Sequence, residues 1–280
     1  MLQLVRPTAL LCAFLCGIYG VSLHADGFAT TAPLDSHATP VVAIIIDDIG
    51  YQGRLGEVAV ALPGPFALAI MPYAPHSNRL AELATAARKN IILHLPMEAY
   101  SRNHLLGKGA LLSGMEDSEI RATLARALAS LPQAIGINNH MGSLFTSHRP
   151  AMDVVMGAIA ARGDLFFVDS RTSGRSAARQ AADAVGVTMV ERHIFLDNEP
   201  IRASIKIQLE RLVTHAKQYG RALAIGHPYP ATLAMLEAWR PDDFGVELVS
   251  LAEYVAAANA PAETANSFPA VAISARETPQ

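Results

Sequence analysis

Residues 41–50 read Val-Val-Ala-Ile-Ile-Ile-Asp-Asp-Ile-Gly, and this stretch decides the fold class. Six consecutive aliphatic residues, most of them β-branched, are typical of a strand that is buried on both faces, as in a parallel sheet. Asp47 and Asp48 follow directly, at the strand end where α/β folds place their chemistry. One aspartate there could simply cap the next helix. Two adjacent carboxylates repel each other and need a cation or a shared proton between them, which predicts a functional site.

Short apolar runs alternate with longer helical patterns along the rest of the chain. The predicted strands comprise residues 41–46, 66–70, 91–94, 135–138, 165–169, 187–190, 222–225 and 246–249. The predicted helices comprise residues 77–89, 118–130, 150–161, 177–184, 203–219 and 229–240. Repeated alternation of strand and helix predicts an α/β fold, either a parallel barrel or a doubly wound sheet.

The charge balance excludes some classes of partner. The 280 residues include 22 basic and 25 acidic residues, which gives a formal net charge of −3. This balance provides no electrostatic attraction to nucleic acid or to an anionic membrane surface. Neither a glycine-rich dinucleotide fingerprint nor a phosphate-binding loop follows a predicted strand, so nucleotide binding has no support either.

The first 25 residues have the pattern of a signal peptide for export. Arg6 provides the positive start, residues 8–23 form an apolar segment, and Ala25 is a small residue suited to cleavage. An uncleaved anchor is the alternative, but the apolar segment is short for a membrane span. We therefore expect a periplasmic or secreted protein whose mature chain has no membrane-spanning segment.

The rest of the chain divides into three parts. Residues 26–40 are rich in Thr, Ala and Pro and are predicted to be a linker, and residues 41–255 are predicted to be the folded domain. Residues 256–280 lack periodicity and are predicted to be a disordered tail. Cys12 and Cys16 both lie in the signal segment, so the cleaved chain would contain no disulfide.

Residues able to bind a metal or move a proton lie at or just after the ends of five predicted strands. They are Asp47, Asp48, His94, His140, Asp169 and His227. In a parallel barrel the carboxyl ends of the strands share one rim, so these side chains are expected to converge. Any one histidine could be a hydrogen-bonded core residue, but the shared location favours a metal site. Two imidazoles and one carboxylate leave a coordination position open for water, as in catalytic zinc sites, and a second carboxylate could accept the proton of that water.

Five motifs of the chain resemble the divergent polysaccharide deacetylase family, a distant relative of the NodB-type carbohydrate esterases. They are Ile46-Asp47-Asp48-Ile49-Gly50, His94-Leu95-Pro96-Met97-Glu98, Asn138-Asn139-His140-Met141-Gly142-Ser143, Phe167-Val168-Asp169-Ser170-Arg171-Thr172 and Gly226-His227-Pro228. The resemblance covers roughly residues 41–255. It implies a distorted (β/α) barrel of about seven strands, a divalent metal on the rim, with zinc favoured, and a polysaccharide or glycan substrate.

The same resemblance implies a role for each matching residue. Asp47 matches the general base of the esterases, and Asp48 and His94 match metal ligands. Glu98 stands where the esterases have a second histidine ligand, so the third ligand is either Glu98 or His140 from the next strand. We favour His140, because imidazole is the commoner ligand of zinc-like metals.

Two further residues complete the implied site. His227 resembles the histidine that protonates the leaving group, and Asp169 resembles an aspartate that orients such a histidine. The alternative for Asp169 is a helix cap or an ion pair with Arg171. Tyr73, Tyr100 and Tyr229 fall just after strands and could either stack on sugars or pack against neighbours.

The sequence therefore favours an exported, metal-dependent hydrolase that deacylates an envelope or extracellular glycan. The alternative is a non-catalytic barrel that binds an envelope glycan or a protein and uses any metal structurally; the departure at Glu98 keeps it open. A metal phosphodiesterase is less favoured, because only Arg171 and Arg192 lie near the predicted site to bind phosphate.

Overall fold

Nine strands, all joined in parallel pairs, form one sheet in the computed structural model, which describes residues 39–259. The strands are β1 (Val41–Ile49), β2 (Ala67–Ile70), β3 (Ile91–Met97), β4 (Gly136–Met141), β5 (Phe166–Asp169), β6 (Met189–Glu191), β7 (Ile194–Phe195), β8 (Arg221–Gly226) and β9 (Glu247–Leu248). The predicted signal peptide, residues 26–38 of the predicted linker and residues 260–280 of the predicted tail lie outside the described residues.

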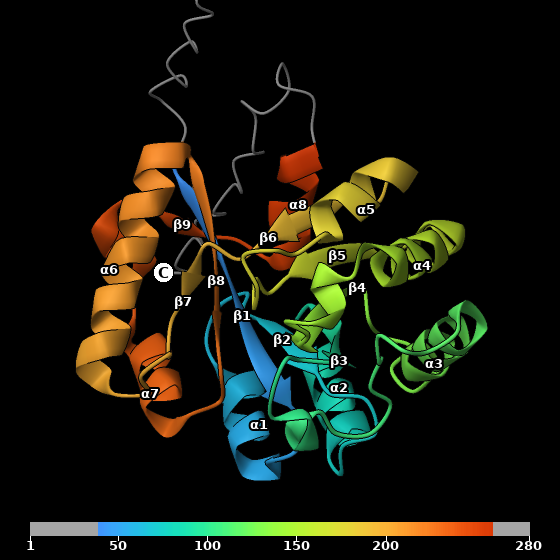
Figure 1. The fold of residues 1–280 in the computed structure, drawn as a ribbon. Helices are drawn as coiled ribbons and strands as arrows, with labels where there is room; N and C mark the ends of the chain where they lie inside the picture. The colour runs from blue at the N-terminus through green and yellow to red at the C-terminus, as the bar shows by residue number, and fades with distance from the viewer. Residues whose placement is uncertain (1–38, 260–280) are drawn as a thin grey trace, which may run out of the picture. The chain divides into compact units, whose positions relative to one another are not determined.

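Eight α-helices of the described residues accompany the strands, most of them around the outside of the sheet (Figure 1). They are α1 (Gly53–Ala61), α2 (Ser77–Ala86), α3 (Asp117–Ala129), α4 (Arg149–Arg162), α5 (Ala178–Val185), α6 (Arg202–Tyr219), α7 (Pro230–Ala238) and α8 (Leu251–Asn259). Three short 3-10 helices lie in the loops: η1 (Asn103–Leu105), η2 (Phe145–Ser147) and η3 (Pro241–Phe244). Among residues 39–259 we find no helix with the length and apolar character needed to traverse a bilayer.

The sheet curls into a distorted barrel. Its strand order is β6-β5-β4-β3-β2-β1-β8-β7, with β9 beside the start of β1. Only two residues separate β6 from β7, and they bond to opposite ends of the sheet. Arg192 donates its backbone N–H to the Asp169 carbonyl (3.0 Å) in β5, and His193 donates to the Leu223 carbonyl (2.9 Å) in β8. The segment that contains β6 and β7 therefore joins the two edges, and the predicted (β/α) barrel of about seven strands is confirmed.

Side-chain alternation along β1 builds the two layers of the core. Val41, Ala43 and Ile45 belong to the apolar cluster inside the barrel, whereas Val42 and the other even-numbered residues pack beneath the helices. Because successive side chains of a strand point to opposite faces, a run that is apolar at every position needs both layers. The buried Tyr254 of α8 joins the inner cluster, and α8 packs against β1 and β6.

The structure adds elements that the sequence analysis did not predict. Helix α1 follows β1 directly, and its two glycines obscured it because glycine is a poor helix former. A Cβ atom on Gly56 would lie 2.4 Å from Leu80 Cδ1, so this glycine permits close packing of α1 on α2. Strand β7 was also missed, since it is only two residues long. At the other end of the domain, α8 continues through residues 256–259, which we had predicted to be disordered.

Candidate metal and catalytic centre

The end of β1 presents both of its aspartates to one site. Alternation along the strand turns Asp47 to the inside of the barrel, where only 3% of it is exposed. The register then shifts between Ile46 and Ile49, and Asp48 has a φ of 57°. A strand without this irregularity would direct Asp48 to the opposite face from Asp47. The bulge therefore allows two consecutive carboxylates to share a site.

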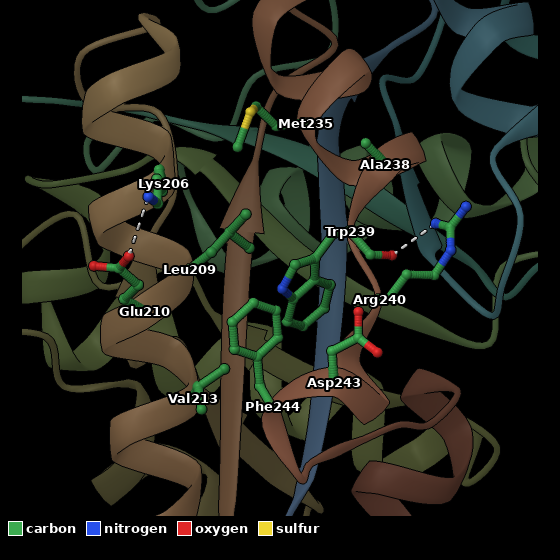
Figure 2. Close-up of a pocket in the computed structure, with 10 residues that line it drawn as sticks. All are labelled: Lys206, Leu209, Glu210, Val213, Met235, Ala238, Trp239, Arg240, Asp243 and Phe244. Carbon is green, nitrogen blue, oxygen red and sulfur yellow. Dashed lines mark hydrogen bonds and ion pairs between the residues drawn. The ribbon is translucent and has the colours of Figure 1, made fainter.

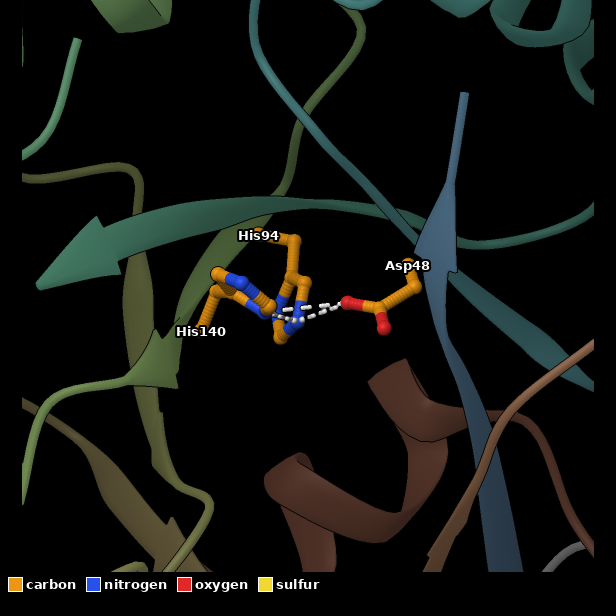
Figure 3. Close-up of side chains that lie close together, drawn as sticks. All are labelled: Asp48, His94 and His140. Carbon is orange, nitrogen blue, oxygen red and sulfur yellow. Dashed lines mark hydrogen bonds and ion pairs between the residues drawn. The ribbon is translucent and has the colours of Figure 1, made fainter. Parts of the chain in front are cut away.

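Asp48 and His140, near the carboxyl ends of β1 and β4, converge with His94 from the middle of β3 (Figure 3). The distance from Asp48 Oδ1 is 3.2 Å to His94 Nε2 and 3.0 Å to His140 Nδ1. The two imidazole nitrogens are 3.2 Å apart. Metal–ligand bonds of about 2.0–2.1 Å in a tetrahedral site place ligand atoms about 3.3 Å apart. The three atoms thus have the spacing of ligands around one ion.

Neighbouring groups orient both imidazoles for metal binding. Asn138 donates through Nδ2 to Asp47 Oδ1 (2.8 Å), so its Oδ1 is the acceptor for His94 Nδ1–H (2.8 Å). His140 Nε2 lies 3.4 Å from the carbonyl oxygen of Leu105, which can only accept. Each ring therefore holds a proton on its far nitrogen and can direct the lone pair of its near nitrogen to the shared point.

Asp48 provides the carboxylate of the cluster. Its Oδ1 is buried and has no partner of hydrogen-bond geometry among residues 39–259. Burial raises the pKa of Asp48, but His140 and His94 outweigh it and hold the pKa well below its usual range. Burial lowers the pKa of His94, yet the charges of Asp47 and Asp48 raise it above its ordinary value. The site thus favours a positive charge, and its nitrogen and oxygen donors fit a zinc-like divalent cation.

A carboxylate and an imidazole flank this cluster. The Oδ2 atom of Asp47 lies 3.7 Å from His94 Nε2, and burial raises the pKa of Asp47. His227 lies across the site, with its Nε2 3.8 Å from Asp48 Oδ2. Burial lowers the pKa of His227, but its hydrogen bond to Asp197 and the charges of Asp47 and Asp48 raise it to about 9. A candidate base and a candidate acid therefore face the same space.

Asp197, and not Asp169, holds His227 in place. Asp197 Oδ1 lies 2.9 Å from His227 Nδ1, and its Oδ2 accepts from the His227 backbone N–H (2.6 Å) and from Thr232 Oγ1 (2.8 Å). Asp169 instead accepts from the backbone N–H of Arg171 (2.7 Å). The expected orienting role of Asp169 is thus wrong, because β5 ends on the far side of the β6–β7 segment. The signal that could have found Asp197 is the apolar run Ile-Phe-Leu that precedes it.

Glu98 is absent from the cluster of candidate ligands. Its Oε2 accepts from the backbone N–H of Ser113 (2.7 Å) and from the Ser113 hydroxyl (2.6 Å). The carboxylate therefore ties together the two ends of the β3–α3 loop. Of the two alternatives for the third ligand, the structure brings His140 to the site and leaves Glu98 bonded elsewhere.

A separate pocket of about 250 Å³ lies on the outside of the barrel, between α6, α7 and η3 (Figure 2). Its walls are mainly apolar, and Trp239 and Phe244 line it side by side. The only ion pair drawn there joins Lys206 to Glu210 along α6 (3.9 Å). The pocket contains none of the strand-end residues, so we do not assign the chemistry to it.

Comparison with known proteins identifies the class of this barrel and its site. The chain belongs to the divergent polysaccharide deacetylase family, whose sequence model matches residues 44–255. It is 38% identical over 196 residues to the uncharacterized protein YibQ of Escherichia coli K12. The aligned residues make up 70% of this chain and 61% of that protein. This chain thus aligns with less than two thirds of the E. coli relative. An uncharacterized protein of Haemophilus influenzae is 36% identical over 203 residues, 72% of each chain.

One solved structure of an uncharacterized protein shares the fold. The crystal structure of an uncharacterized protein from Agrobacterium tumefaciens C58 superimposes with a TM-score of 0.74 at 24% identity, covering 79% of this chain and 92% of that one. A family 4 carbohydrate esterase from Streptomyces lividans, solved with acetate, gives a TM-score of 0.44 at 13% identity over 76% of this chain and 92% of that one.

Proposed function

We propose that this chain is a metal-dependent hydrolase that removes acyl groups from a polysaccharide. Membership of the divergent polysaccharide deacetylase family supports a deacetylase-like role. The observation that carries the proposal is the unpartnered, buried Oδ1 of Asp48, on which two imidazole nitrogens converge. An apolar or purely structural rim would not need this concentration of charge, because each buried charge without a partner is costly.

Asp48, His94 and His140 would hold the cation, for which we propose zinc. A bound divalent cation would supply Lewis acidity, which polarises an acyl carbonyl and lowers the pKa of a water molecule. Asn138 fixes His94 and at the same time occupies Oδ1 of Asp47. Only the Oδ2 atom of Asp47 then remains available to accept a proton.

Asp47 and His227 would move the protons. Asp47 Oδ2 accepts a proton from the attacking water, and the buried setting that raises its pKa makes it a stronger base. His227 donates the proton on Nε2 to the leaving amine or alcohol. Asp197 keeps the other ring proton on Nδ1, so that the donor nitrogen points to the site.

Acetate release provides the test. Zinc-loaded wild-type protein should release acetate from N- or O-acetylated glycans, and Asp47→Asn should lower the rate by about 10²–10⁴-fold, the usual contribution of a general base. Asp169→Asn is the matched control, since Asp169 is equally buried and bonds to Arg171 outside the proposed site. Equal rates for wild type and Asp47→Asn, or no acetate from any substrate, would exclude the catalytic proposal.

The non-catalytic alternative rested on the departure at Glu98. Glu98 is bonded to Ser113, and His140 lies with Asp48 and His94 instead, so the departure does not argue against a three-ligand site. A glycan-binding barrel without activity would bind acetylated substrate and release nothing, so the acetate assay also decides between the two functions.

We further propose that the protein is exported and acts outside the cytoplasm. The support is the N-terminal sequence alone, which lies outside the described residues. Cell fractionation with N-terminal sequencing of the recovered protein tests this: cleavage after Ala25 is expected, and an intact chain in the cytoplasm would exclude it.

A further inference from the structure

Four tyrosines with exposed side chains follow four adjacent strands of the barrel. They are Tyr100 after β3, Tyr73 after β2, Tyr51 after β1 and Tyr229 after β8, and the residues are 57%, 38%, 44% and 39% exposed. These four strands are adjacent in the order β3-β2-β1-β8, so the tyrosines follow neighbouring strand ends. We call this set the tyrosine strip. Adjacent strands lie about 4.8 Å apart, so the strand ends that the tyrosines follow span about 14 Å.

The tyrosine strip borders the proposed catalytic centre. The ring of Tyr229 lies 5.5 Å from the ring of His227. Tyr51 follows Asp48 by three residues, and its hydroxyl packs against Gly107, where a Cβ atom would lie 2.1 Å away. The same loop supplies the Leu105 carbonyl that faces the His140 ring. A ligand on the strip would therefore extend from the reacting group outward over several strands.

Two cations lie above the outer tyrosines. Lys108 Nζ is 5.5 Å from the ring centre of Tyr73, and the Arg175 guanidinium is 5.9 Å from that of Tyr100. Among the described residues, neither cation has a carboxylate within 4.0 Å, whereas Arg171 on the same rim is paired with Glu191. The outer half of the strip thus offers positive charge that the protein itself does not neutralise.

We propose that the tyrosine strip binds an extended, carboxylated glycan, whose sugar rings stack on the tyrosines and whose carboxylates pair with Lys108 and Arg175. The inference rests on the proposed function, because it places the acylated sugar beside Tyr229. Sugar rings expose C–H groups that pack on aromatic faces, and the tyrosine hydroxyls can bond to sugar hydroxyls. A substrate of several sugar units uses the whole strip, and a single acylated sugar does not.

Binding measured without turnover tests the proposal. The zinc-loaded Asp47→Asn chain is titrated by calorimetry with a hyaluronan hexamer, which carries N-acetyl and carboxylate groups, and with a neutral N-acetylglucosamine hexamer. The hyaluronan hexamer should bind at least about tenfold more tightly than its disaccharide. Adding Tyr100→Ala should weaken this binding about three- to tenfold, as expected for the loss of one aromatic contact. Adding Lys108→Gln should weaken binding of hyaluronan and leave binding of the neutral hexamer unchanged.

Matched controls lie on α6, away from the rim. Tyr219 is 54% exposed, and Tyr219→Ala and Lys217→Gln should not change either affinity. Because all these side chains are exposed, melting curves should show that each variant stays folded. Equal affinity for Tyr100→Ala and Tyr219→Ala would overturn the strip, and equal affinity for the neutral and carboxylated hexamers would overturn the charge preference. Neither result depends on acetate release, so failure here is distinguishable from failure of the proposed function.

Discussion

Asn138→Ala is expected to damage the metal centre without removing any of its ligands. Asn138 is fully buried in β4 and bridges Asp47 Oδ1 and His94 Nδ1, each at 2.8 Å. Alanine removes both partners, so a buried carboxylate oxygen and a buried ring N–H remain unpaired. His94 is then free to rotate or to change its protonated nitrogen, and Asp47 loses the contact that fixes its free oxygen.

The magnitude follows from these two contacts. A buried polar group left without its hydrogen bond costs about 1–3 kcal/mol, so two of them should lower the free energy of unfolding by about 2–6 kcal/mol. Loss of the group that orients a metal-binding histidine typically weakens metal affinity 10–100-fold, or about 1.4–2.7 kcal/mol. The variant should therefore lose both stability and affinity for zinc.

Asn139→Ala is the matched control. Asn139 is the next residue of β4, is 1% exposed, and faces away from the cluster. Its amide donates to the Met141 carbonyl (2.7 Å) and accepts from the Ser170 backbone N–H (2.9 Å). Asn139→Ala should cost a similar free energy of unfolding, about 2–6 kcal/mol, and leave the zinc affinity within about twofold of wild type.

Two measurements separate these effects. Urea denaturation of the metal-free proteins gives the free energy of unfolding, and competition against a chromogenic chelator gives the zinc affinity. Wild-type affinity in Asn138→Ala, or equal losses of affinity in the two variants, would show that Asn138 does not orient His94 for a cation.

Three further predictions concern stability. Gly50→Ala should lower the free energy of unfolding by about 2 kcal/mol or more, because φ of Gly50 is +130° and an alanine Cβ would lie 2.6 Å from Ser77 Oγ. Urea denaturation should show a lower midpoint, and an unchanged midpoint would contradict the observed backbone. Tyr254→Phe should be neutral or stabilising, since the buried hydroxyl has no partner among residues 39–259, whereas Tyr254→Ala should cost about 3–5 kcal/mol; equal losses would refute this. Burial, followed by the nearby His215, lowers the pKa of His193 to about 4 in the folded protein. In the unfolded chain this histidine has a pKa of about 6.5, so between pH 6.5 and 4 the unfolded chain binds more protons than the folded one. The free energy of unfolding should therefore fall as pH drops from 6.5 to 4, by less than about 1 kcal/mol for this partly solvated ring, and the melting temperature should fall with it. The fall should be smaller in His193→Asn, and identical pH profiles of the two proteins would exclude this cause.

Local sequence patterns were sufficient to predict the strands that carry the site. The aliphatic run before Asp47 and Asp48 and the shorter run before His227 place these residues at or just after strand ends, whatever the neighbouring strands are. The run before His94 predicted its strand, but β3 continues to Met97. Because parallel strands end at the same rim, their convergence followed from the fold class alone. Short elements were harder to predict: β7 has two residues, and too few positions show alternation.

The amino-acid order by itself determined which side chains reach the rim, because an apolar run and its first polar residue are neighbours in the chain. Only the tertiary structure decided how those side chains pair. Asp169 and Asp197 both follow apolar runs, but the β6–β7 segment closes the barrel against β8 and thereby brings Asp197 to His227. Glu98 likewise lies four residues from His94, yet its partner is Ser113. Such pairings depend on contacts between residues distant in sequence, which no local periodicity records.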